Sequence, residues 1–307
     1  MTGAGSEMRE FRFEPAAATM FVLDVPARGP GWAGGTAGAR ASGSASAPVG
    51  RAAGVSPGGQ LVPVVFVHGL GSASTVAFRP AAVEPALVGR RLLLVDLLGF
   101  GHSERPERWG YTLDEHADSV AALLDAAGLR SVCLVGHSMG GAVAILLAAR
   151  RPELVASLLV AEPNLDSRGG TPSTLIAAQV EDEFVASGWA DLIRMFEADP
   201  ASVSYARTLA LSSPVALHRS ARGLVAPRSP SIGEILGGLA LPRRLLVGER
   251  SLPYPGVEAL AAAGVKVVTL PGVGHNMSLE DPGRFASEVA VAAAQADSVR
   301  VPEGPRA

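Results

Sequence analysis

The sequence predicts an α/β fold, with a mainly parallel, doubly wound sheet and an all-helical cap insertion. Short apolar runs alternate with helix-like stretches, a pattern typical of strands that helices cover on both faces. Connections between such strands are right-handed crossovers, which make neighbouring strands parallel. The runs that we predict as core strands are residues 62–67, 91–95, 131–135, 157–161, 244–247 and 265–270.

The first 26 residues are predicted to add two strands to the core, at residues 11–13 and 19–25. Residues 27–60 contain no acidic residue and consist largely of Gly, Ala, Ser, Pro and Arg. Such a segment lacks an apolar face that would offset the entropy lost on ordering it, so we expect a flexible insertion. The core resumes at 61–165 and 241–298, and 299–307 is expected to be a flexible tail.

Helices are predicted at residues 113–127, 139–150 and 282–294, between core strands or after the last one. Thr112 and Glu115 have the spacing of a capping box at the start of the first of these helices. The interval 166–240, in contrast, contains several helix-like pieces and no convincing strand. Because ligands bind beyond the carboxyl ends of parallel strands, we expect this interval to form a helical cap over the site.

Composition limits the class of protein. Of the 307 residues, 48% are hydrophobic and 18% are charged, which excludes a wholly disordered chain. The net charge of −3 supplies no field that would attract nucleic acid or an anionic membrane. The start of the chain lacks the apolar region of a secretory signal, and no apolar run approaches the ~20 residues of a membrane-spanning helix. The single cysteine, Cys133, excludes a cysteine-rich zinc site. We therefore expect a cytoplasmic protein with no metal, cofactor, nucleic-acid or membrane partner.

The motif with the most chemical information is Gly136-His137-Ser138-Met139-Gly140, which directly follows a predicted strand and opens a predicted helix. A Gly-x-Ser-x-Gly turn in this context exposes the serine hydroxyl above the sheet and points helix amides at an oxyanion formed there. A serine hydroxyl is a weak nucleophile at neutral pH, so it needs a neighbouring base whose pKa lies near the working pH. The sequence therefore predicts Ser138 as a nucleophile; the alternative is an incidental serine in a strand-turn-helix.

From about residue 62 to residue 294 the chain resembles the α/β-hydrolase family, because this motif and three others follow in the family's order. His68-Gly69-Leu70 comes after the first core strand, and the resemblance implies that the amides of Leu70 and Met139 form an oxyanion hole. Gly272-Val273-Gly274-His275 follows the last strand, and the resemblance implies that His275 is the catalytic base. The Asp96-Leu97-Leu98-Gly99-Phe100-Gly101-His102-Ser103 turn is similar to a structural turn of the family.

The acid that would orient His275 departs from the family's common pattern. Members usually place an aspartate in a Gly-x-x-Asp turn after the next-to-last strand, but the matching turn here is Gly248-Glu249-Arg250-Ser251. Serine cannot hold the charge that stabilises an imidazolium. Glu162 ends the strand after the nucleophile helix, the position that some haloalkane dehalogenase-like members use, so we predict Glu162 as the acid and Glu249 as the alternative. Otherwise Glu162 forms a salt bridge to the cap, and Glu249 is a solvated turn residue.

We predict a carboxylesterase-like serine hydrolase that cleaves a small apolar ester, thioester or lactone through an acyl-enzyme intermediate. The family's dehalogenases and epoxide hydrolases attack with a carboxylate from the turn that holds Ser138 here, so the resemblance argues against both activities. The alternatives are a carbon-carbon bond hydrolase or an acyltransferase on the same triad, or a non-catalytic ligand-binding member of the fold. Four cap side chains are candidates for an apolar substrate pocket, unless they only pack the cap onto the core: Phe184, Trp189, Met195 and Phe196.

Overall fold

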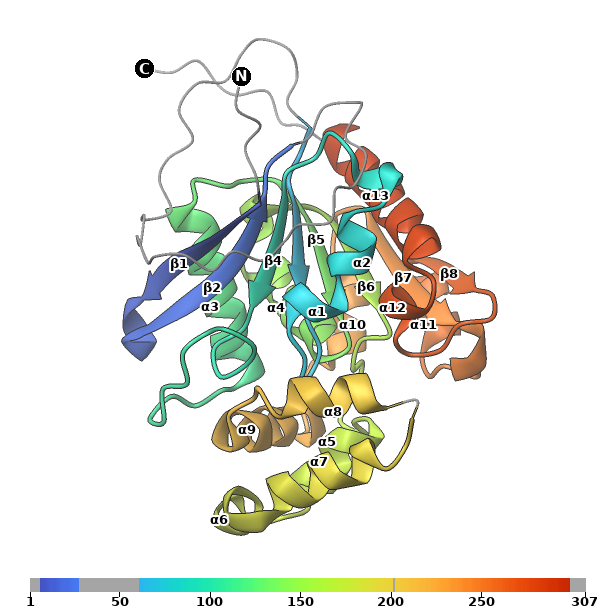
Figure 1. Ribbon diagram of the computed structural model, residues 1–307. Coiled ribbons are helices and arrows are strands. Elements are labelled where there is room, and N and C mark those ends of the chain that lie inside the picture. Colours follow the sequence, from blue (N-terminus) through green and yellow to red (C-terminus); the bar gives the residue numbers. More distant parts are fainter. Residues whose placement is uncertain (1–5, 28–60, 201, 299–307) are drawn as a thin grey trace.

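The described residues of this computed structural model, 6–27, 61–200 and 202–298, form a central eight-stranded sheet (Figure 1). The strand order is β1-β2-β4-β3-β5-β6-β7-β8. Apart from Ala27, the predicted insertion 27–60 lies outside the described residues, as does the predicted tail 299–307. The strands are β1 (Glu7–Phe13), β2 (Ala18–Val25), β3 (Val64–Val67), β4 (Leu92–Asp96), β5 (Val132–His137), β6 (Val155–Ala161), β7 (Arg243–Gly248) and β8 (Lys266–Leu270).

The strands β3 to β8 pair in parallel, whereas β1 and β2 are antiparallel additions at one edge. The predicted core strands and the mainly parallel sheet are thus confirmed. The prediction for the first strand, residues 11–13, is too short, because β1 begins at Glu7. An edge strand is solvated along most of its length, and β1 carries exposed or half-buried side chains up to Phe13. It therefore lacks the continuous apolar run by which the buried strands are found.

Helices cover both faces of the sheet, as Figure 1 shows. Successive side chains of a strand enter opposite layers, so Val65 and Val67 of β3 pack with α3 and α4, while Val64 and Phe66 pack with α2 and α13. No helix of the described ranges is both long and apolar enough to cross a membrane. The helices of these layers are α1 (Ser74–Ala77), α2 (Arg79–Ala82), α3 (Leu113–Ala126), α4 (Met139–Arg150), α10 (Ile232–Gly238), α11 (Val257–Ala262), α12 (Met277–Glu280) and α13 (Pro282–Ser298). Short 3₁₀ turns lie at Glu14–Ala16, Pro85–Leu87, Pro152–Leu154 and Glu249–Ser251.

A separate group of helices lies off one end of the sheet, in the lower part of Figure 1. It consists of α5 (Thr171–Ala177), α6 (Glu181–Glu183), a π-helical turn at Phe184–Gly188, α7 (Trp189–Glu197), α8 (Val203–Leu209) and α9 (Pro214–Val225). We call these helices the cap. Between α5 and α6 the chain leaves the helical conformation: Val180 is extended, and the imidazole of His218 on α9 forms a hydrogen bond of 2.9 Å with the Gln179 carbonyl.

Helix α10 lies within the interval predicted as cap, 166–240, but it packs against α4 and α11 of the core. The Gly233 amide donates a hydrogen bond of 2.8 Å to the carbonyl of Leu165, next to the end of β6. Leu236 is fully buried in the core layer. Sequence alone did not separate α10 from the cap, because an amphipathic helix has the same pattern whichever apolar surface it covers.

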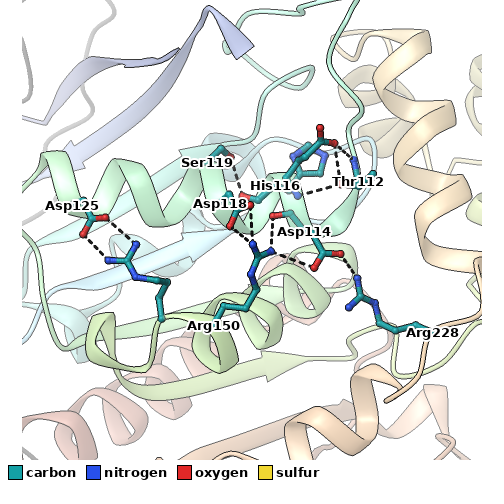
Figure 2. A network of polar contacts seen from close by, with 10 residues as sticks. Thr112, Asp114, His116, Asp118, Ser119, Asp125, Arg150 and Arg228 are labelled. Atoms are coloured by element: carbon teal, nitrogen blue, oxygen red, sulfur yellow. Dashed lines mark hydrogen bonds and ion pairs between the residues drawn. The ribbon is translucent and has the colours of Figure 1, made fainter. Parts of the chain in front are cut away.

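Arginine residues connect the surfaces of α3, α4 and the segment after α9 (Figure 2). Arg150 of α4 pairs with Asp114 at 3.2 Å and with Asp118 at 2.8 Å, both on α3. Arg228, which follows the cap, pairs with the same Asp114. Because these side chains are partly exposed, each pair contributes little to stability, about 0–1 kcal/mol. The predicted capping box of Thr112 and Glu115 is present beside this network.

Replacing Gly140 by alanine tests how closely helix α4 approaches strand β3. A Cβ atom at Gly140 would lie 2.3 Å from the carbonyl oxygens of Val67 and His68. We expect the Gly140→Ala variant to lose about 3 kcal/mol of unfolding free energy, at the upper end of the usual cost of overpacking, in urea denaturation.

The matched control is Gly238→Ala at the end of α10, where a Cβ would meet nothing within 4 Å. That variant should be neutral or stabilised by up to about 1 kcal/mol. Equal stabilities of the two variants would contradict the close approach.

Candidate active site

Ser138 lies in a strained turn between β5 and α4. Its backbone has φ 53° and ψ −121°, a conformation that costs a non-glycine residue of the order of 1–3 kcal/mol. The two glycines of the motif leave room for the turn: a Cβ at Gly136 would lie 2.4 Å from the Gly140 carbonyl oxygen. Ser138 lines a cavity at the carboxyl end of the sheet. The surrounding structure therefore imposes a conformation that exposes the serine to that cavity.

His275 is hydrogen-bonded to Glu162, and both line the same cavity as Ser138. The Nδ1 of His275 lies 2.7 Å from Oε2 of Glu162. An ionised carboxylate only accepts, so Nδ1 carries the proton and Nε2 of the neutral ring is left as a base. The Glu162 side chain is only 3% exposed and the His275 side chain is 48% exposed. The pair therefore combines a buried acid with an imidazole that a ligand can reach.

Further hydrogen bonds hold the carboxylate of Glu162. The Gly248 amide donates to Oε1 at 2.8 Å, and the Ser251 side chain contributes a smaller stabilisation of the charged carboxylate. Burial by itself raises the pKa of this carboxyl, but the hydrogen bonds from His275 and Gly248 and the attraction of His275 outweigh burial and lower it. Glu162 is therefore ionised at neutral pH.

The alternative acid, Glu249, lies elsewhere. Its carboxylate is exposed and accepts a hydrogen bond of 2.8 Å from the Gly272 amide. Sequence reasoning missed the part that Ser251 plays beside Glu162, and it also missed Tyr254, whose hydroxyl donates to the Pro163 carbonyl at 2.5 Å. The match of Ser251 to the family's usual acid position was the signal that could have found the first of these contacts.

His137, next to the serine, is buried and supports the loop of His275. Its Nε2 forms a hydrogen bond of 2.9 Å with the His275 carbonyl, and the two rings are 4.6 Å apart. Burial, together with repulsion from His275, lowers the pKa of His137 to about 3. His137 is therefore neutral and acts as a fixed hydrogen-bond donor to the loop.

The predicted oxyanion donors, Leu70 and Met139, are both buried near the serine. Met139 is the first residue of α4, so its amide has no acceptor within the helix. Leu70 lines the cavity and follows His68, whose Nδ1 donates to the Gly69 carbonyl at 2.8 Å and whose Nε2 accepts from the Leu97 amide at 3.0 Å. The function of the two amides as an oxyanion hole stays a prediction.

The cavity has a volume of about 1030 Å³ and lies between the core and the cap. Of the four predicted pocket residues, Phe196 lines it. Phe184 instead packs fully buried against His218, the Trp189 ring donates to the Leu209 carbonyl at 3.2 Å, and Met195 is exposed. Those three do not line this cavity, because adjacent positions of a helix point in different directions, and only tertiary packing decides which one faces a cavity.

Charged side chains lining the cavity are paired with one another among the described residues. Asp166 pairs with Arg168 at 2.5 Å, and Arg250 pairs with Glu280, as Glu162 does with His275. The part of the chain that the structure describes holds no cluster of three His, Cys, Asp or Glu side chains suited to a metal ion. With His275 neutral, the three carboxylates Glu162, Asp166 and Glu280 face two guanidiniums, Arg168 and Arg250, so the lining offers no excess of positive charge.

Comparisons with known proteins agree on one family. A family model described as alpha/beta hydrolase fold matches residues 62–227. The 2-hydroxymuconate semialdehyde hydrolase of Pseudomonas sp. (strain CF600) is 39% identical over 99 residues, 32% of this chain and 35% of that protein. Lipase LipV of Mycobacterium tuberculosis is 34% identical over 140 residues, 42% of this chain and 52% of that protein. The chain thus spans about a third to a half of the length of these curated relatives.

One solved structure extends the likeness over nearly the whole chain. A thermophilic esterase from Thermogutta terrifontis superposes with a TM-score of 0.66 at 20% identity, covering 96% of this chain and 100% of the other. At that identity, the likeness shows the shared fold.

Three buried histidines should make the fold sensitive to mild acid. Burial is the largest cause that lowers the pKa of His68, His116 and His137, to about 3 for the last two. The unfolded chain binds protons at these imidazoles below about pH 6.5 and the folded chain does not, so the free energy of unfolding should fall as pH drops from 6.5 to 5. The expected slope approaches about 1.4 kcal/mol per pH unit for each of His116 and His137, measured by urea denaturation, and His68 adds to it in the same direction.

NMR titration shows whether the buried histidines, and not other titratable groups, cause the loss of stability in acid. The ring nitrogens of His137 should not titrate between pH 5 and 8 in the folded protein, whereas all six imidazoles should titrate near pH 6.5 in urea. Titration of His137 near pH 6.5 in the folded protein would contradict its neutral state.

Proposed function

The chain belongs to the α/β hydrolase fold family, and we propose that it is a serine hydrolase that cleaves an uncharged, largely apolar ester, thioester or lactone. The observation that carries the proposal is the hydrogen bond of 2.7 Å between His275 and the buried Glu162, in the cavity that Ser138 on its strained turn also lines. A base, an acid that orients it and an exposed hydroxyl in one cavity are what acyl transfer through a serine requires.

In the proposed mechanism the Ser138 hydroxyl attacks the substrate carbonyl while Nε2 of His275 takes its proton. Glu162 holds the tautomer of His275 and stabilises the imidazolium that forms. The amides of Leu70 and Met139 donate to the oxyanion of the tetrahedral intermediate. His275 then gives its proton to the leaving group, and an acyl-enzyme remains. His275 then takes a proton from a water molecule, whose oxygen attacks the acyl carbon; the bond from that carbon to the Ser138 oxygen breaks, His275 returns the proton to Ser138, and the carboxylic acid product leaves.

The lining of the cavity supports an uncharged substrate. Both arginines that line it are paired with carboxylates, so a free carboxylate on the substrate would have to compete with Asp166 or Glu280 for an arginine. Apolar side chains come from both the core and the cap: Leu70, Val76, Ala77, Pro163, Leu165, Pro172, Phe196 and Leu224. Burial of apolar surface would therefore supply most of the binding energy.

The same reasoning weighs against the alternative functions. Hydrolysis of a carbon-carbon bond uses the same three side chains. The relative from Pseudomonas, however, is named for a muconate semialdehyde, which carries a carboxylate. The cavity offers no unpaired cation among its described residues to bind such a group. A non-catalytic binding protein was suggested by Ser251, which stands where most family members have an aspartate. The contact between Glu162 and His275 supports an enzyme instead, because the acid is supplied from β6.

Replacing Ser138 tests the proposal directly. A fluorophosphonate probe should label the wild-type protein and not Ser138→Ala, and kcat/KM on a short p-nitrophenyl ester should fall by about 10⁵–10⁶-fold. The control is Ser204→Ala, which removes an exposed cavity hydroxyl and should retain labelling. No labelling of the wild type, or equal labelling of Ser138→Ala, would overturn the proposal. Faster turnover of a succinate monoester than of a neutral ester of equal length would contradict the uncharged substrate.

The identity of the acid is tested by two amide substitutions of the same kind. Glu162→Gln keeps the shape but cannot stabilise the imidazolium, so we expect kcat to fall by about 10⁴-fold. Glu249→Gln should leave kcat close to wild type, because that carboxylate bonds to the Gly272 amide on the surface. Steady-state kinetics on the same ester gives the comparison, and the reverse order of the two losses would move the acid to the turn after β7.

A further inference from the structure

The cap touches the loop of the predicted oxyanion hole through helix α8. The hydroxyl of Tyr205 donates a hydrogen bond of 3.0 Å to the carbonyl of Leu70. One residue later, Gly71 has φ +68°, and a Cβ there would lie 2.4 Å from Cδ2 of Leu209 and 3.0 Å from the Tyr205 hydroxyl. Helix α8 therefore sits on this loop so closely that no side chain fits between them.

Two successive peptide groups of the loop are held from opposite sides. The Gly69 carbonyl and the Leu70 amide belong to one planar trans peptide, and His68 of the core donates to that carbonyl at 2.8 Å. The Leu70 amide must point the opposite way from the carbonyl that His68 binds. The next peptide carries the Leu70 carbonyl, and Tyr205 of the cap binds it. The two peptide planes meet at the Cα atom of Leu70. Holding both planes therefore restricts φ and ψ of Leu70, and with them the direction of its amide.

Tyr205 is itself well held. Its ring packs edge-on against Phe196 with the centroids 5.0 Å apart, and both residues line the cavity. Burial raises the pKa of the Tyr205 hydroxyl, so it stays protonated and remains a donor across the working pH range. A carbonyl oxygen cannot donate, which leaves Tyr205 as the donor in this contact.

We propose that Tyr205 is a positioning residue that aims the Leu70 amide at the oxyanion, so that the seated cap completes the oxyanion hole. The inference rests on the proposed function, since it assigns Leu70 to the transition state of that reaction. The Leu70 amide, oriented in this way, stabilises the oxyanion of the transition state more than it stabilises the bound substrate. Loss of that orientation therefore lowers kcat and leaves KM nearly unchanged.

The experiment compares two tyrosines that each donate one hydroxyl to a backbone carbonyl. Tyr205→Phe removes the contact with Leu70, and the matched control Tyr111→Phe removes a hydrogen bond of 2.9 Å to the Pro106 carbonyl, in a buried position that does not line the cavity. Each variant is measured for thermal stability, for kcat and KM on a neutral p-nitrophenyl ester, and for inhibition by a trifluoromethyl ketone, which forms a tetrahedral oxyanion adduct with an active-site serine.

For Tyr205→Phe we expect kcat to fall about 5- to 20-fold at nearly unchanged KM, less than the ~10²–10³-fold cost of losing an oxyanion donor outright. Trifluoromethyl ketone affinity should fall by a similar factor. For Tyr111→Phe, kcat and inhibitor affinity should stay at wild-type values whatever its loss of thermal stability.

Three results would overturn the inference: an unchanged kcat in Tyr205→Phe, equal kcat losses in the two variants, or a raised KM at constant kcat. The proposed function fails separately. If wild-type protein neither hydrolyses neutral esters nor reacts with the fluorophosphonate, the hydrolase and the oxyanion hole are both rejected before the variants are compared. If wild type is active and Tyr205→Phe is indistinguishable from it, only the positioning role is rejected.

Discussion

The close approach of the turn after β5 to the end of β3 is the constraint on which the rest of the site depends. Gly140 lies so near the carbonyls of Val67 and His68 that a single methyl group would not fit. This contact brings the strained Ser138 beside the loop that carries Leu70, although the two lie far apart in the sequence. It holds because β3 and β5 are paired neighbours in the middle of the sheet. The pairing of β3 with β5 therefore holds Ser138 in its unfavourable backbone conformation, which the residues of the turn would not adopt by themselves.

Strand pairing also explains how Glu162, the residue directly after β6, reaches His275. Ala161 pairs with Leu246, and the Glu162 amide donates to the Leu246 carbonyl, so Glu162 lies directly beside the turn that follows β7. The Gly248 amide at the start of that turn donates to the carboxylate, and Ser251 of the same turn contributes a smaller stabilisation of its charge. The usual position of the acid and the position proposed here are neighbours across one pair of strands. A glutamate side chain is one methylene longer than that of aspartate. Glu162 can therefore start from the neighbouring strand and still place its carboxylate next to His275.

The cap and the core share the cavity and are tied together at several points. Tyr205 bonds to the loop of Leu70, and Arg219 of α9 donates to the carbonyls of Glu107 and Trp109 while it pairs with Glu181 of the cap. Polar contacts of this kind are directional, so they specify how the cap sits more than how stable it is. The orientation of the cap thus bears on the shape of the cavity and on the loop beside the serine.

By itself the sequence determined the elements and the motifs: the alternation of apolar runs and helices, the Ser138 turn, and the positions of His275 and Glu162 at the ends of strands. These follow from local rules, because strand burial, helix caps and a glycine-lined turn leave their mark on consecutive residues. Tertiary structure decided which groups meet. It paired His275 with Glu162 rather than Glu249, placed α10 on the core, and turned Phe196 but not Phe184, Trp189 or Met195 toward the cavity. Those outcomes depend on contacts between residues distant in sequence, and an amphipathic pattern is the same whichever apolar surface it meets.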